Sequence, residues 1–179
     1  MKPFYIFTGG PGSGKSSVLE VLASLGYSTV PEVGRAIIKQ QIQQQGHALP
    51  WQNKQRFYER MLEQSIADYN KQEKDTLTFF DRGVLDSIGY AHLEELHVHP
   101  LHYTLAQTTS YAPIVFIFPP WEAIYQQDTE RKQDFELATQ TYRIMRTTYE
   151  KFGYQLVEVP CTTLEKRTAF ILDYLHLKQ

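Results

Sequence analysis

Residues 4–16 read Phe-Tyr-Ile-Phe-Thr-Gly-Gly-Pro-Gly-Ser-Gly-Lys-Ser, and this stretch decides the fold. Its first five residues are mostly aromatic or β-branched, which predicts a strand buried on both faces of a sheet. The glycines that follow predict a loop. Apolar residues at helical spacing from Val18 to Leu25 then predict a helix that ends at Gly26. The chain therefore begins with a strand, a glycine-rich loop and a helix.

The loop carries a phosphate-binding pattern. Residues 9–16 match G-x-x-x-x-G-K-[ST] and lie between a predicted strand and a predicted helix, as this motif requires. Backbone N–H groups of such a loop face the phosphates, Lys15 can reach the β- and γ-phosphates, and the Ser16 hydroxyl can bind Mg²⁺. A turn that only joined a strand to a helix would not require the Lys-Ser pair. We expect the nucleotide to contact Gly9, Gly10, Pro11, Gly12, Ser13, Gly14, Lys15, Ser16 and Ser17.

The rest of the chain repeats strand and helix patterns. Further strands are predicted at residues 27–31, 77–80, 113–118 and 154–159. Helices are predicted at residues 36–45, 51–73, 84–96, 101–108, 135–152 and 164–177, the first two on the surface. Strands that alternate with helices predict an α/β fold. No linker or repeat is visible, so we expect residues 1–179 to form a single domain.

Composition excludes several classes of protein. With 42% hydrophobic and 21% charged residues, the 179-residue chain is not disordered. A formal charge of −2 gives no basic footprint for nucleic acid or an anionic membrane, so phosphate binding must be local. Cys161 is the single cysteine, and the N-terminus lacks the apolar stretch of a signal peptide or a membrane span. We expect a cytoplasmic protein.

Charged residues follow the predicted strands, where ligands of open α/β sheets bind. Glu32 and Arg35 follow the second strand, Asp81 and Arg82 follow the third, and Glu122 comes shortly after the fourth. A carboxylate there can hold Mg²⁺ or accept the proton of an attacking hydroxyl, and an arginine can clamp a phosphoryl group. The alternatives are a helix cap with an ion pair at 81–82 and a surface ion pair at 32–35. The position of both pairs at strand ends favours the functional interpretation.

Three other segments allow weaker predictions. A charge cluster at residues 126–136 is predicted to be a lid, in which Arg131 and Lys132 could close over ATP, although a solvated helix start is the alternative. The histidines at 97, 99 and 102 could bind a metal, but we expect them in a surface loop because no cysteine completes a site. The aromatic residues at 51, 57 and 58 could stack an acceptor base, although such spacing more often indicates core.

The loop motif, residues 31–35, residues 80–90 and residues 131–135 together resemble the P-loop AAA-type predicted ATPases. That group includes the nicotinamide riboside kinase domain of bacterial NAD-biosynthesis regulators. Membership implies a three-layer fold with a parallel five-stranded sheet in the order 2-3-1-4-5. The Pro-Glu-x-x-x-Arg and Asp-Arg segments are more distantly similar to deoxyribonucleoside kinases, in which the glutamate is the general base. Those enzymes have Glu-Arg-Ser where this chain has Asp81-Arg82-Gly83, so the proton acceptor stays open between Glu32 and Asp81.

The sequence thus predicts an ATP- and Mg²⁺-dependent phosphotransferase that acts on a small hydroxyl-bearing acceptor, a nucleoside or nucleotide-like compound. The predicted catalytic residues are Lys15, Glu32, Asp81, Arg82 and Arg131, the metal ligands are Ser16 and Asp81, and the acceptor contacts are Glu32, Arg35 and Arg82. The chain lacks a guanine-specifying Asn-Lys-x-Asp motif, which favours ATP but leaves GTP open. The alternative is a nucleotide-binding switch that hydrolyses ATP or GTP slowly and binds a protein or phosphoinositide.

Overall fold

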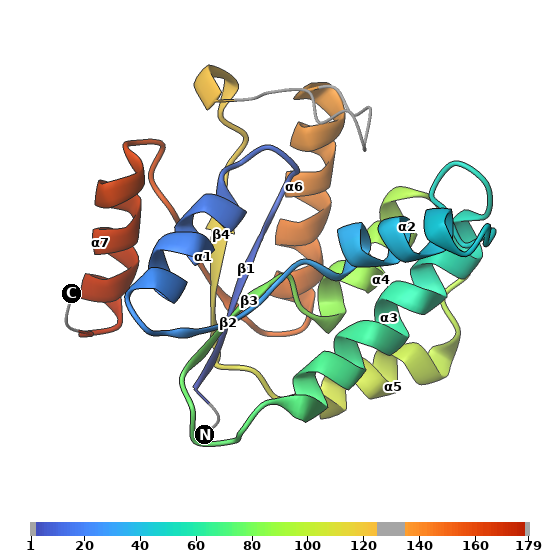
Figure 1. The fold of residues 1–179 in the computed structure, drawn as a ribbon, viewed down its shortest axis with the longest axis horizontal. Helices are drawn as coiled ribbons and strands as arrows, with labels where there is room; N and C mark the ends of the chain where they lie inside the picture. Colours follow the sequence, from blue (N-terminus) through green and yellow to red (C-terminus); the bar gives the residue numbers. More distant parts are fainter. Residues whose placement is uncertain (1–2, 125–134, 178–179) are drawn as a thin grey trace.

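The computed structural model of the chain describes residues 3–124 and 135–177, which form a parallel sheet between two helical layers (Figure 1). The strands are β1 (Phe4–Gly9), β2 (Ser28–Val30), β3 (Thr78–Asp81), β4 (Ile114–Phe118) and β5 (Gln155–Glu158). The helices are α1 (Lys15–Ser24), α2 (Val33–Gln43), α3 (Lys54–Lys71), α4 (Val84–Leu93), α5 (Pro100–Thr108), the short 3₁₀ helix η1 (Glu122–Ile124), α6 (Phe135–Lys151) and α7 (Leu164–Tyr174). The sheet order is β2-β3-β1-β4-β5, which confirms the predicted order and the α/β class.

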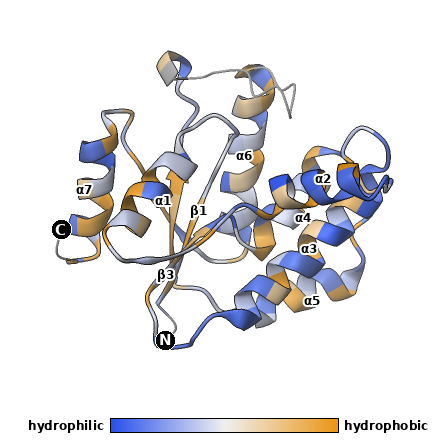
Figure 2. Cartoon of the chain, viewed as in Figure 1, coloured by the Kyte–Doolittle hydropathy of each residue, from blue (hydrophilic) through white to orange (hydrophobic). Residues whose placement is uncertain are grey.

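Two hydrophobic cores lie on the two faces of the sheet, because successive side chains of a strand point in opposite directions. Phe4 and Ile6 of β1 are fully buried on the face that α4 and α6 cover. Phe7 points to the other face, where it packs with Phe116 under α1 and α7. In Figure 2, α2 and α3 carry both hydrophilic and hydrophobic residues, as expected of amphipathic helices.

The register of the sheet brings distant loops to one edge. Phe7 pairs with Asp81 of β3, and Gly9 pairs with Phe118 of β4. Because all the strands are parallel, the residues after β1, β2 and β3 emerge at the same edge as the glycine loop. This edge is the candidate site.

Helices α2 and α3 lie at the periphery, as the sequence predicts, but each buries one face. Ile37 and Ile38 of α2 pack with Phe57 of α3, and Tyr58 on α3 enters the main core beside α4. Helix α2 begins at Val33, three residues earlier than predicted, so that Glu32 occupies the N-cap position at the sheet edge. The two helices therefore form a wall beside the site.

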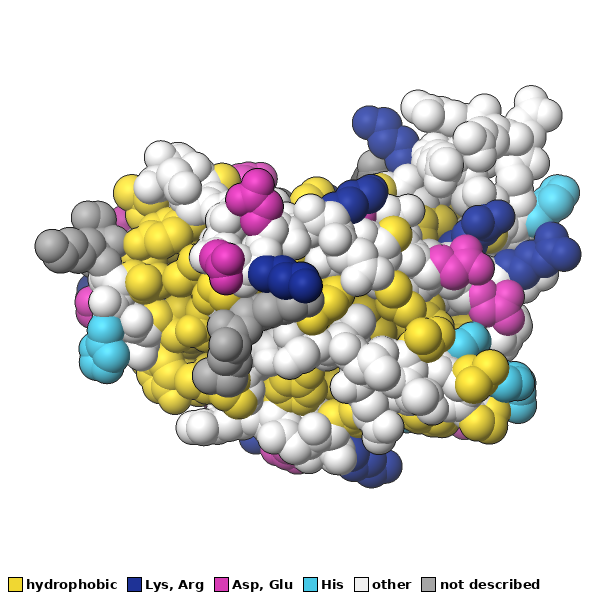
Figure 3. Space-filling model, turned by 90° about the horizontal axis from the view of Figure 1, so that it is seen from below, with side chains coloured by type: hydrophobic (Ala, Val, Ile, Leu, Met, Phe, Trp, Pro, Cys, Tyr) yellow, Lys and Arg dark blue, Asp and Glu magenta, His cyan; other side chains and the backbone are white. Residues whose placement is uncertain are grey.

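The surface carries charges of both signs. In Figure 3, which views the molecule from below, basic and acidic side chains are interspersed with hydrophobic ones and form no single-sign field on that face. Within residues 3–124 and 135–177, no helix combines the length and the apolar character that a membrane crossing requires.

Replacing Phe116 with alanine should test the core under α1 and α7. Its side chain is fully buried against Phe7 and Tyr174, so Phe116→Ala should lower the free energy of unfolding by about 3–5 kcal/mol. Leu101→Ala, which truncates a side chain 62% exposed, is the matched control and should change it by under about 0.5 kcal/mol. Chemical denaturation measures both. Equal losses of unfolding free energy in the two variants would contradict the assignment of Phe116 to the core under α1 and α7.

Candidate functional site

The glycine loop joins β1 to α1 and has a conformation that larger residues resist. Gly9 has φ of 130°, and a Cβ built there would lie 2.3 Å from the carbonyl oxygen of Phe118 on β4. Gly14 has φ of 80° at the N-cap of α1. The pattern of glycines thus follows from the closeness of β4 and from the left-handed entry to the helix.

Lys15 reaches back over the loop. Its Nζ donates to the carbonyl oxygen of Gly10 at 2.8 Å and lies 3.3 Å from the Ser13 hydroxyl, and the residue is only 5% exposed. The Ser13 hydroxyl in turn donates to the Gly10 carbonyl oxygen at 2.9 Å. The ammonium group is thereby held within the loop that is expected to surround phosphates.

Ser16 and Asp81 meet beside the loop, as expected of a metal pair. The Ser16 hydroxyl donates to Asp81 Oδ2 at 2.8 Å, while the buried Oδ1 atom has no hydrogen-bond partner. Burial raises the pKa of the Asp81 carboxyl above its ordinary value, and the ammonium of Lys15 opposes this shift. An unsatisfied carboxylate oxygen beside a hydroxyl is a suitable ligand set for Mg²⁺, so these residues fit that ion.

Arg82 links the other charged residues of the edge. Its Nε donates to Glu32 Oε1 at 3.0 Å, and its Nη1 donates to the Gly9 carbonyl oxygen at 3.0 Å and to Asp86 Oδ1 at 3.1 Å. Burial lowers the pKa of the guanidinium, but the carboxylates of Glu32 and Asp86 outweigh that effect and raise it. The backbone of Arg82 has φ of 74°, a strained conformation for a residue with a side chain.

Asp86 holds Arg82 in place, and the sequence alone did not predict it as a residue of the site. The residue is 4% exposed. Beside Arg82, three donors reach its carboxylate: the Thr8 hydroxyl at 2.6 Å, the Tyr149 hydroxyl at 2.5 Å and the Gly83 N–H at 2.8 Å. These donors come from β1, α6 and the start of α4. Asp86 therefore positions Arg82, and through it Glu32.

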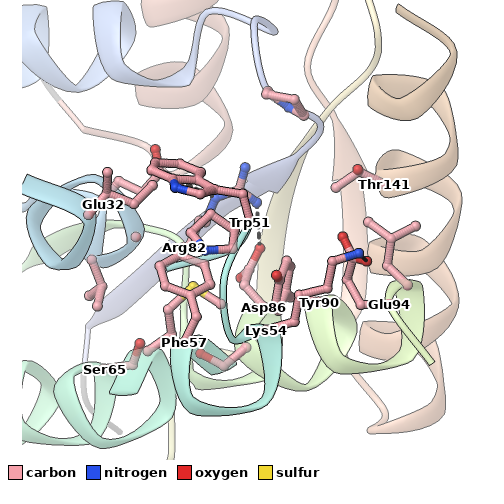
Figure 4. Close-up of a pocket in the computed structure, with 18 of the residues that line it drawn as sticks. Glu32, Trp51, Lys54, Phe57, Ser65, Arg82, Asp86, Tyr90, Glu94 and Thr141 are labelled. Atoms are coloured by element: carbon pink, nitrogen blue, oxygen red, sulfur yellow. Dashed lines mark hydrogen bonds and ion pairs between the residues drawn. The ribbon is translucent and has the colours of Figure 1, made fainter. Parts of the chain in front are cut away.

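A cleft of about 1040 Å³ opens beside this network (Figure 4). Helices α2, α3, α4 and α6 contribute its walls, and Pro11 of the glycine loop lies at one end. Glu32, Arg82 and Asp86 lie together there, and Phe57 packs edge-on against Tyr90 with ring centroids 5.5 Å apart. The Tyr90 hydroxyl is buried and has no hydrogen-bond partner. The sequence alone did not predict Tyr90 as a residue of the site. The cleft is a mainly apolar chamber that has Glu32, Arg82 and Asp86 on its wall and also contains the ion pair between Lys54 and Glu94.

The predicted residues have different outcomes. The structure gathers Lys15, Ser16, Glu32, Asp81 and Arg82 at one edge. The Nε atom of Arg35 lies 3.8 Å from Glu32 Oε2, and the Arg35 side chain is 54% exposed. Glu122 is exposed on η1, and the predicted lid residues Arg131 and Lys132 fall outside the described residues.

The structure supports some of the predictions for the aromatic residues and the histidines and not others. Trp51 and Phe57 line the cleft, the first 56% exposed and the second buried. Tyr58 belongs to the core, where its hydroxyl lies 2.7 Å from His102 Nδ1. His99 caps α5 by accepting the Leu101 N–H. His97 and His99 thus lie between α4 and α5, as expected, whereas His102 lies within α5 and not in the loop.

Comparisons with known proteins bear on the family and the fold of the chain. The family described as "AAA domain" matches residues 4–167. No curated protein matches the chain. Among solved structures, NadR in complex with NR has a TM-score of 0.75 at 15% identity, over 98% of this chain and 52% of that one. Thymidylate kinase from Ehrlichia chaffeensis has a TM-score of 0.65 at 14% identity, over 97% and 98%. Deoxyadenosine kinase from M. mycoides with bound dATP has a TM-score of 0.58 at 16% identity, also over 97% and 98%. At these identities the likeness shows a P-loop kinase-like fold.

Asp86→Asn should show how far the site depends on the buried carboxylate. All four partners of Asp86 are donors, so the amide group would face at least one of them unfavourably and would release Arg82. We expect the free energy of unfolding to fall by about 2–4 kcal/mol. Chemical denaturation is the measurement. The matched control Asp173→Asn, at an exposed position of α7, should leave it nearly unchanged. A stable Asp86→Asn protein would contradict the role given to this carboxylate.

Asp81→Asn should have the opposite effect on stability. Because burial raises the pKa of this carboxyl, its ionised form destabilises the folded chain, and the asparagine variant should be as stable as the parent or more stable near pH 7. The difference should vanish below about pH 3.8, where the folded and unfolded states both hold the proton, and should grow as pH rises toward the folded-state pKa. Thermal unfolding across pH checks this. A parent that gains stability over the variant with rising pH would contradict it.

Proposed function

The chain belongs to the AAA-domain family, and from this premise we propose that it transfers the γ-phosphoryl group of ATP to a small hydroxyl-bearing acceptor in the cleft. One observation carries the proposal. Among the described carboxylates, Glu32 lines both the cleft and the smaller hollow beside Ser16 and Asp81. An acceptor hydroxyl at Glu32 would therefore lie between the walls that bind it and the loop that binds phosphate.

The two carboxylates then have separate tasks. Asp81 lines the smaller hollow between α1 and α2 but not the cleft, and it accepts a hydrogen bond from Ser16, which suits a metal ligand. Glu32 faces the cleft, and Arg82 holds its Oε1 atom in place. In this mechanism Glu32 accepts the proton of the attacking hydroxyl, and the Arg82 guanidinium stabilises charge on the transferring group. This division favours Glu32 over Asp81 as the base.

The nucleotide belongs on the other side of Glu32. The loop N–H groups and Lys15 would bind the β- and γ-phosphates. Mg²⁺, held by Ser16 and Asp81 when bound, would neutralise charge on the phosphate oxygens. Lys15 and Arg82 keep their positive groups fixed before the reaction begins, so the reaction requires little reorganisation.

The walls of the cleft suit an acceptor with a flat ring. Phe57 and Tyr90 form an edge-on aromatic pair inside it, and Trp51 and Ile42, both more than half exposed, line it as well. Aromatic walls with few polar groups bind planar apolar surfaces and leave the charged end to orient the hydroxyl. Deoxyadenosine kinase, thymidylate kinase and NadR share the fold, which supports a nucleoside or nucleotide-like acceptor.

ADP production from ATP and Mg²⁺ tests this function. The reaction would be followed with and without nucleosides, nicotinamide riboside, nucleoside monophosphates and short inositol phosphates. Stimulation of several-fold by one compound supports the phosphotransferase and identifies its acceptor. A flat, slow rate across the panel would contradict the proposal and favour a nucleotide-binding switch.

Glu32→Gln distinguishes the base from the metal ligand. With the acceptor found in that panel, the acceptor-stimulated rate should fall by roughly 10²–10⁴-fold, because the amide cannot accept the hydroxyl proton. Binding of ADP should be retained, since the loop residues are intact. Glu63→Gln on α3, where the carboxylate is 67% exposed, is the matched control and should react like the parent. Full activity of Glu32→Gln would remove Glu32 from the mechanism.

A further inference from the structure

Arg167 on α7 lies behind the glycine loop and takes no part in the site described so far. It is 3% exposed, and its Nη2 donates to the carbonyl oxygen of Ser13 at 2.7 Å. The guanidinium carbon lies 4.9 Å from the centre of the Phe118 ring and 5.6 Å from that of Trp121. The group is thus fixed between two aromatic rings and the loop.

Among the residues that the structure describes, the charge of Arg167 has no carboxylate as its partner. Within residues 3–124 and 135–177, no carboxylate forms an ion pair with it, and its buried Nε atom has no hydrogen-bond partner. Burial lowers the pKa of the guanidinium, which reflects the cost of keeping this cation away from water. A buried cation without a counter-ion is unfavourable even when a carbonyl and two rings contact it, so a nearby anion would stabilise it.

The contact with Ser13 also determines where a loop N–H points. In a trans peptide the C=O and N–H bonds lie in one plane and point in opposite directions. Because the Ser13 carbonyl is directed at Arg167, the N–H of Gly14 in the same peptide is directed away from it. Gly14 is the N-cap of α1, where N–H groups bind anions.

We propose that Arg167 is a positioning residue of the phosphate site, which orients the Ser13–Gly14 peptide and supplies positive charge behind the loop. The inference rests on the proposed function only in so far as the loop binds the phosphates of a nucleotide. Arg167 acts through Ser13 and not by direct contact. Its two aromatic neighbours keep the planar group from rotating out of this position, a constraint that a lysine ammonium cannot meet.

Binding of ADP, measured by calorimetry in the presence of Mg²⁺, tests the inference without any acceptor. Arg167→Met keeps most of the apolar stem and should weaken ADP binding by roughly tenfold or more, the effect of losing a hydrogen bond from a charged group. Arg167→Lys keeps the charge and should recover part of the loss. Lys166→Met removes the same charge from the adjacent, exposed position of α7 and should bind ADP like the parent.

The outcomes separate a positioning role from a structural one. A residue that only stabilised the fold would lower the melting temperature of Arg167→Met but leave its ADP affinity unchanged well below that temperature, and this result would overturn the inference. If Arg167→Met does not fold, Arg167→Lys decides, because unchanged ADP affinity in that variant would equally overturn it. Weaker binding in both, with the control unaffected, supports it.

The same measurements keep this inference separate from the proposed function. If the parent binds ADP but no acceptor stimulates turnover, the phosphotransferase fails while the Arg167 result stands. If the variants bind ADP as the parent does and an acceptor is phosphorylated, only the inference fails. A parent that does not bind ADP overturns both. With a working acceptor, Arg167→Met should raise the KM for ATP and leave the KM for the acceptor unchanged.

Discussion

The buried carboxylate of Asp86 is the interaction on which the site depends. It receives donors from β1, from the start of α4 and from α6, so one side chain ties the sheet to the helical layer that covers it. It also holds Arg82, which in turn holds Glu32 and the Gly9 carbonyl. Donors around a buried carboxylate offset the cost of taking it out of water, and one of the donors of Asp86, Arg82, also holds Glu32 at the sheet edge. The stability of this region and the geometry of the site are therefore coupled.

Local sequence patterns predicted most of the fold. The continuous apolar runs gave strands because both faces of the sheet are covered, and the glycine loop was recognisable because its motif is contiguous. The order of the strands could not be predicted in this way, because strand spacing does not determine it. Only the resemblance to a family implied the order that the structure has. Helix α2 begins three residues earlier than predicted, with Glu32 at the N-cap position, and apolar periodicity does not reveal this boundary.

The candidate site was predictable only in part, because some of its residues contact partners that are far away in the sequence. Glu32, Asp81 and Arg82 follow strands, so a rule about sheet edges identifies them. Asp86 lies within a helix and meets partners 78 and 63 residues away, and Arg167 meets Ser13 across 154 residues. Each residue taken alone is an ordinary helix position. Only the packing of α4 and α7 brings them into contact with the loop region.

The two incompletely satisfied groups near the loop have opposite preferences. Asp81 presents a carboxylate oxygen without a hydrogen-bond partner, which favours a cation. Arg167 presents a buried guanidinium that pairs with no carboxylate of residues 3–124 and 135–177, which favours an anion. The first lies on β3 beside Ser16, and the second lies on α7 behind Ser13. A metal–polyphosphate complex carries both kinds of charge in one ligand. A chain with a formal charge of −2 can therefore bind a highly charged nucleotide through the local arrangement of its side chains, without a basic surface.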